Sequence, residues 1–207
     1  MDLRHATFSF CAGRGGDKQQ ARKKENYMQI TKEVRDGLLD EIKESLENVA
    51  KELSARCCFG RRDWTNEILE RLSALGKKNR QSLCCGVAPD SENKIGEWLY
   101  DLIWWTKVEN GDGVERMGEV VLVLESEWSW SPFDVRYDFQ KLIQAKSYIK
   151  VFISDMLSDE TQAQLREDVE CFKQKDVDES SRYLFAMYDH KIKNFSFKCI
   201  KDFCSRL

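Results

Sequence analysis

The stretch from residue 119 to residue 154, EVVLVLESEWSWSPFDVRYDFQKLIQAKSYIKVFIS, decides the predicted fold. It opens with an apolar run, residues 120–124, of the kind found in strands that are buried on both faces. A helical pattern from Asp134 to about Lys146 follows, and a second apolar strand, residues 147–154, closes the unit. The stretch therefore predicts a strand–helix–strand unit, whose ligands are expected near the carboxyl ends of the strands.

Two acidic residues, Glu125 and Glu127, stand at the end of the first of these strands. Because side chains alternate along a strand, both carboxylates lie on the same side, about 6.6–6.8 Å apart along the backbone. Carboxylates in such a place are costly unless they are solvated, paired or holding a cation. The pair is therefore a candidate cation site, and solvated strand-end charges are the alternative.

The composition describes a globular chain with a sizeable core, since 42% of its 207 residues are hydrophobic and 33% are charged. A net charge of −3 argues against a bulk coat of nucleic acid but leaves a local basic patch open. No apolar run approaches the roughly 20 residues of a membrane span, and no signal-peptide core is seen. We therefore expect a cytoplasmic protein without a membrane partner, whose eight cysteines are reduced. A zinc site that combines Cys57–Cys58 with Cys84–Cys85 is the alternative.

The N-terminal part of the chain is predicted to form an arm followed by a helical extension. Residues 1–29 have no period, whereas residues 30–56 and 64–78 show helical apolar stripes, so a helical pair is expected that packs on the sheet or on itself. We divide the chain into an N-terminal arm and helical extension, residues 1–60, and an α/β domain, residues 61–207. The overall class is α/β or α+β, with a mixed central sheet flanked by helices.

A hairpin precedes the acidic pair. The aromatic-rich segment 96–108 reads as a strand that carries Asp101, and the turn signal NGDG, residues 110–113, joins it to the strand that ends at Glu127. A hairpin centred near residue 113 places Asp101 opposite Glu125. A short strand is also expected within residues 81–87, a helix after Ser158, and two closing strands from Arg182 and from Asn194.

Two or three carboxylates that converge in this way suit a hard divalent cation, Mg²⁺ or Mn²⁺. Such an ion lowers the pKa of bound water and neutralises the charge of a phosphoryl transition state. Asp101 as a satisfied buried polar group is the alternative.

Asp101 on one strand, followed by Glu125-Ser126-Glu127 at the end of the next strand and then by a helix and a strand, resembles the PD-(D/E)XK nuclease superfamily. The likeness to this restriction-endonuclease-like fold covers roughly residues 64–154. It implies metal ligands at Asp101 and Glu125, with the backbone carbonyl of Ser126 as an additional ligand. It also implies a nucleic-acid substrate, in particular DNA, and homodimers, which are common in the superfamily.

The chain departs from the superfamily pattern at two positions. Tyr100 stands where a proline usually precedes the aspartate, and Glu127 stands at the lysine position. Glu127 is then a third ligand or a general base, and the lysine is sought in the following helix. Spacing favours Lys141, whereas the apolar stripe of the helix favours Lys146.

Further candidates come from the same resemblance. Gln144 and Tyr148 match the Q-x-x-x-Y motif of RecB-type nucleases, and Glu67 matches an acidic residue that some members place near the metal. A solvated helix carboxylate is the alternative for Glu67. Trp128 and Trp130 flank the acidic pair and are read as core residues or as surfaces on which a base stacks.

The sequence thus predicts a Mg²⁺-dependent endonuclease or other phosphodiesterase. The first alternative is a catalytically inactive module of the same fold that binds nucleic acid or protein. A domain whose aromatic surface docks a protein partner is the third reading.

Overall fold

The computed structural model describes residues 30–55, 60–79, 81–85, 99–109, 114–173 and 181–199. Within these ranges the chain forms four helices and one six-stranded sheet. The elements are α1 (Lys32–Ser54), α2 (Arg61–Lys78), β1 (Ser82–Cys85), β2 (Leu102–Glu109), β3 (Glu115–Glu127), α3 (Pro132–Gln144), β4 (Ile149–Asp155), α4 (Asp159–Lys173), β5 (Arg182–Asp189) and β6 (Asn194–Cys199). None of the described helices is both long enough and apolar enough to span a bilayer.

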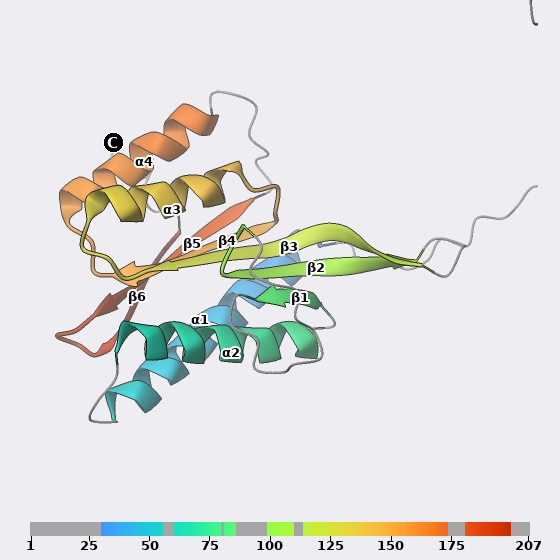
Figure 1. Cartoon of the computed structure of the whole chain (residues 1–207), viewed down its shortest axis with the longest axis horizontal. Coiled ribbons are helices and arrows are strands. Elements are labelled where there is room, and N and C mark those ends of the chain that lie inside the picture. Colours follow the sequence, from blue (N-terminus) through green and yellow to red (C-terminus); the bar gives the residue numbers. More distant parts are fainter. Residues whose placement is uncertain are drawn as a thin grey trace, which may run out of the picture.

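The strands lie in the sheet in the order in which they occur along the chain, from β1 to β6. β1, β2 and β3 are antiparallel neighbours, β3, β4 and β5 are parallel, and β6 returns antiparallel to β5. The sheet is therefore mixed and has helices on both faces (Figure 1). This confirms the predicted α/β class.

Each pair of helices covers one face of the sheet. α1 and α2 pack on one face and α3 and α4 on the other (Figure 1). On the first face, Leu46 of α1 and Leu72 of α2 share one buried cluster with Leu124 of β3. On the second face, Phe139 of α3 and Leu165 of α4 share another. The N-terminal helical pair thus packs on the sheet, which is one of the two arrangements that the sequence left open.

The predicted helix after β3 is correct in type and shifted in its ends. Ser131 rather than Asp134 is the N-cap, and Pro132 occupies the first turn, where a missing N–H group costs nothing. The helix ends at Gln144, because Ala145 is extended (φ −66°, ψ 137°). Lys146 therefore lies beyond the helix, and the helical-wheel argument that favoured it was wrong.

The strand predicted over residues 96–108 begins only at Leu102 within the described residues. Asp101 lies in the bend just before it rather than inside the strand. This placement avoids the cost of a carboxylate within the hydrogen-bonded ladder.

The hairpin register matches the prediction beside Asp101 and Glu125 and differs from it in the pairs nearer the turn. Leu102 pairs with Leu124, so Asp101 and Glu125 are the next residues on the two strands. Towards the turn the register shifts twice, and Lys107 pairs with Met117. Each shift adds one residue to β3, as a β-bulge does. The turn itself, the N-terminal arm and Cys57–Cys58 lie outside the described residues.

Candidate functional site

Five residues gather where β3 ends beneath α3. Glu125 and Glu127 alternate with Leu124, which belongs to the core under α1 and α2, so both acidic side chains lie on the face that α3 covers. We use the term acidic cluster for Asp101, Glu125, Glu127 and Asp138, together with Lys141.

Glu125 is the most buried member, with 3% of its surface exposed. Lys141 Nζ lies 2.8 Å from Glu125 Oε1. The contact is an ion pair with poor hydrogen-bond alignment, because this oxygen has no donor that meets hydrogen-bond geometry. Burial raises the pKa of Glu125 to about 8, the Asp101 charge adds to the rise, and the contact with Lys141 offsets part of it.

Lys141 bridges two carboxylates. Its Nζ is also 2.8 Å from Asp138 Oδ1, one turn earlier on α3. Burial opposes the charge on Lys141, but the contacts with Asp138 and Glu125 outweigh it and raise the pKa of the ammonium group. Lys141 therefore remains charged at neutral pH and compensates the acidic residues around it.

Asp101 is held by its neighbour across the hairpin. Its Oδ2 accepts hydrogen bonds from the backbone N–H of Ser126, at 2.7 Å, and from Ser126 Oγ, at 2.8 Å. Burial raises the pKa of Asp101, and the two bonds from Ser126 offset part of that rise. Because both bonds go to one oxygen, they fix the orientation of the carboxylate.

Glu127 lies at the outer side of the cluster. Its Oε1 accepts a hydrogen bond from the backbone N–H of Ser129. Burial raises the pKa of Glu127, the Ser129 bond lowers it, and the neighbouring Asp138 and Asp134 carboxylates raise it further. The site is thus rich in carboxylates and holds one lysine, a balance that favours a cation.

Tyr100, which precedes Asp101, takes part in the site's architecture. Its hydroxyl donates a hydrogen bond to the backbone carbonyl of Lys141 at 3.3 Å. Tyr100 therefore ties the start of β2 to α3.

The other candidate site residues lie away from the acidic cluster. Lys146 and Gln144 are exposed. Tyr148 packs partly against the core on the opposite face of the sheet. Glu67 pairs with Arg71 on α2, at 2.9 Å, on that same opposite face.

Asp138 is the member that the sequence reasoning missed. It precedes Lys141 by three residues, a spacing that places both on the same side of a helix. The signal in the sequence is an acidic residue on the same side of the predicted helix as the candidate lysine.

The two tryptophans after the cluster differ in environment. Trp128 is buried, and its Nε1 donates to Thr65 Oγ1 at 2.9 Å. Trp130 is 80% exposed. Burial in the core therefore explains why a tryptophan stands at position 128, but it does not explain the exposed tryptophan at position 130.

No group of three or more His, Cys, Asp or Glu side chains is arranged as a ready metal site within the described part of the chain. Lys141 lies between two of the carboxylates and keeps them paired with itself. The alternative zinc site rests on Cys57, Cys58, Cys84 and Cys85, whose side chains lie outside the described residues.

Comparison of the chain with protein-family models, with curated proteins and with solved structures finds no match.

Proposed function

We propose that this protein hydrolyses phosphodiester bonds of nucleic acid, in particular DNA, with a divalent cation at the acidic cluster. The observation that carries the proposal is a buried carboxylate, Glu125, that faces Lys141 at 2.8 Å and lies beside Asp101 in the hairpin register. A carboxylate pair next to one lysine supplies both ligands for a hard cation and a positive charge for a phosphoryl oxygen.

The donor set fits Mg²⁺ or Mn²⁺. Carboxylate oxygens are the preferred ligands of these ions, and Glu125 Oε1 is a buried acceptor without an aligned donor. Glu125 and Asp101 would hold the cation, and Asp101 would do so through its Oδ1, because its Oδ2 already accepts two hydrogen bonds from Ser126. When bound, the cation lowers the pKa of a coordinated water and screens charge on the phosphoryl group.

The protein's own residues have distinct roles in the proposal. Ser126 orients the Asp101 carboxylate, and its backbone carbonyl is an additional candidate ligand. Lys141 would direct its Nζ at the nucleophilic water or at a phosphoryl oxygen. Glu127 would serve as a third ligand or as a general base, and burial raises its pKa above the usual value, which is the direction that a general base needs.

The test measures cation uptake and cleavage separately. Mn²⁺ binding is followed by titration calorimetry, and cleavage is followed with end-labelled single-stranded and duplex DNA in Mg²⁺ or Mn²⁺. We expect Asp101→Asn and Glu125→Gln each to lower cleavage by about 100-fold or more and to remove Mn²⁺ uptake. Glu119→Gln, an exposed glutamate on the same strand, should behave like the parent protein. Unchanged cleavage in both cluster variants would refute the assignment.

A catalytically inactive module is the second candidate, and one observation favours it. Lys141 Nζ already contacts the Glu125 and Asp138 carboxyl groups at 2.8 Å each, as in a structural cluster, and Glu127 stands at the lysine position of the superfamily pattern. This reading predicts neither Mn²⁺ uptake nor cleavage at millimolar metal, while the protein stays folded.

A further inference from the structure

Trp130 is exposed and yet held in place. Its indole Nε1 donates to Asp155 Oδ2 at 3.1 Å, and Asp155 Oδ1 lies 2.8 Å from His190 Nε2. The guanidinium carbon of Arg61 lies 5.2 Å from the ring centroid. Arg61 covers one face of an indole that is 80% exposed, so the other face is offered to solvent. Residues from β4, α2 and the β5–β6 turn thus orient one flat aromatic surface.

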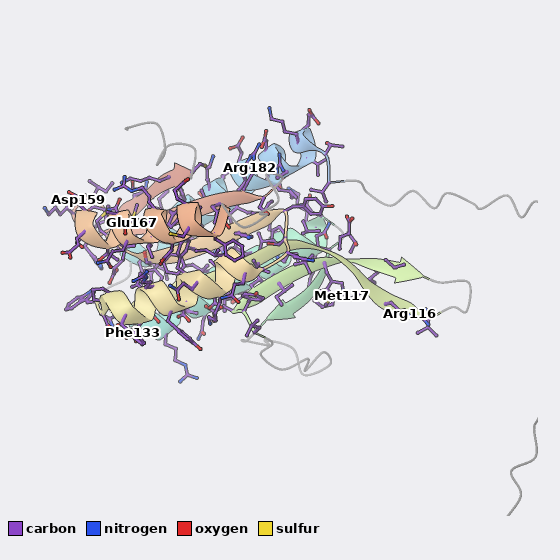
Figure 2. The ribbon with its side chains drawn as sticks, turned by 90° about the horizontal axis from the view of Figure 1, so that it is seen from above. Arg116, Met117, Phe133, Asp159, Glu167 and Arg182 are labelled. Atoms are coloured by element: carbon purple, nitrogen blue, oxygen red, sulfur yellow. The ribbon has the colours of Figure 1, made fainter. Side chains whose placement is uncertain are left out.

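Two more exposed aromatic side chains follow Trp130 in the sequence and lie on α3. Phe133 is 76% exposed and Tyr137 is 60% exposed, and a spacing of four residues places them on the same side of the helix. Phe133 lies at the N-terminal end of α3 (Figure 2). We use the term aromatic rim for Trp130, Phe133 and Tyr137. Lys141 Nζ is 6.0 Å from the Tyr137 ring centroid, so the Tyr137 end of this rim borders the acidic cluster.

Exposed basic side chains lie at the same end of the molecule. Arg61 and Arg62 begin α2, and Lys191 and Lys193 lie in the turn between β5 and β6. In Figure 1 the start of α2, the start of α3 and the β5–β6 turn share the left end, where β3 and β4 also end. The combination of exposed aromatic rings with basic side chains is typical of sites for single-stranded nucleic acid.

We propose that this end of the molecule binds a single-stranded segment of nucleic acid, with one base stacked on Trp130 and the adjoining phosphates near Arg61 and Arg62. The inference rests on the proposed hydrolase function and specifies its substrate. In a duplex, neighbouring base pairs cover the faces of the bases, so only an unpaired strand or a frayed end offers a base to an exposed indole. The strand then runs along the aromatic rim to the acidic cluster.

The experiment measures binding without cleavage. A fluorescein-labelled oligonucleotide of about 12 nucleotides, within the usual site sizes, is titrated with the full chain in EDTA, as single strand and as duplex. We expect tighter binding of the single strand and quenching of tryptophan emission. Trp130→Ala should lower the affinity about tenfold or more, because stacking on one aromatic ring is lost. Trp130→Phe should keep most of the affinity and lose the quenching.

The controls lie at the other end of the molecule. Arg116 and Met117 are exposed on the far part of the β2–β3 hairpin (Figure 2). Met117→Ala should not change binding. Arg61→Ala should weaken binding and reduce its salt dependence by about one counterion, whereas Arg116→Ala should leave both unchanged.

The outcomes separate this inference from the proposed hydrolysis. If cleavage needs Asp101 and Glu125 while Trp130→Ala binds the single strand as the parent does, the inference is wrong. The proposed hydrolysis would be unaffected by that result. Binding that depends on Trp130 without Mn²⁺ uptake would support the inference for an inactive module. If the parent binds no oligonucleotide, or if the rim mediates self-association instead, the inference is wrong.

Discussion

At the scale of single residues, Glu125 combines burial with nearby charges of both signs. It lies among Asp101, Asp138 and Lys141, and its pKa is raised to about 8. In the proposed function, a cation would have to displace the proton of Glu125 and compete with the Lys141 ammonium for the same oxygen. The properties of the cluster should therefore depend on pH and on Lys141 in predictable directions.

The first prediction concerns stability against pH. The folded pKa of Glu125 lies above its usual value of 4.5, so between about pH 4.5 and pH 8 the folded state binds the proton more tightly than the unfolded chain. The free energy of unfolding contributed by this residue falls as pH rises through that window. Glu125→Gln removes the effect, so the variant should gain on the order of 1–3 kcal/mol over the parent between pH 5 and pH 9.

Urea denaturation at pH 5, 7 and 9 measures this difference. Glu119→Gln is the control, because this glutamate is exposed on the same strand. A stability difference between Glu125→Gln and the parent that does not change with pH would show that Glu125 ionises normally.

The second prediction concerns Lys141. Lys141→Met removes the ammonium that competes for Glu125, so Mn²⁺ affinity should rise severalfold while cleavage falls by about 100-fold. Lys146→Met, at an exposed lysine beyond the helix, should change neither quantity. Calorimetry and single-turnover cleavage provide the two measurements. Equal loss of affinity and rate in Lys141→Met would instead indicate that the lysine holds the site together.

At the scale of elements, the pairing of β2 with β3 positions the cluster. Asp101 comes opposite Glu125 because of the two register shifts. The pair nearest the turn, Glu109 with Glu115, is centred one residue earlier than residue 113, and the two extra residues of β3 offset this difference before the cluster is reached. The second shift brings Gly118 against β2. A Cβ atom at Gly118 would lie 2.5 Å from Thr106 Oγ1 and 3.0 Å from the Thr106 carbonyl oxygen, so this position requires glycine.

The third prediction compares two glycines. Gly118→Ala should lower the free energy of unfolding by about 1–3 kcal/mol, because the added methyl group forces β3 away from β2. Gly37→Ala is the matched control on α1, where a Cβ meets nothing within 4 Å, and it should raise stability by about 0.5–1 kcal/mol. Thermal or urea denaturation measures both. A stable Gly118→Ala protein would show that the strands can separate there without cost.

At the scale of the whole molecule, α1 belongs to the core beneath the sheet. Leu46 is fully buried in the cluster that also contains Leu122 and Val151 of the central strands. Tyr188 at the end of β5 joins α1 through a 3.0 Å hydrogen bond between its hydroxyl and Ser54 Oγ. Removal of packing in α1 should therefore weaken the entire domain.

The fourth prediction tests this coupling. Leu46→Ala should lower the free energy of unfolding by about 2–5 kcal/mol in a single cooperative transition, since a cavity opens between α1 and the sheet. Far-ultraviolet circular dichroism and tryptophan fluorescence should report the same midpoint. Two separate transitions, with the sheet unaffected, would mean that α1 folds independently.

The sequence by itself determined the α/β class and the strand–helix–strand unit around residues 119–154, and its turn signal indicated that Asp101 and Glu125 lie on neighbouring strands. These follow from apolar periods of 2 and 3.6 residues and from a turn signal, which are local properties of the chain. Only the tertiary structure decided that Lys141 rather than Lys146 contacts Glu125, that Asp138 joins the cluster, and that Trp128 is buried while Trp130 is exposed. The reason is that these outcomes depend on where α3 ends and on which helices cover each face of the sheet. Contacts between residues far apart in sequence set both, so a local pattern does not contain them.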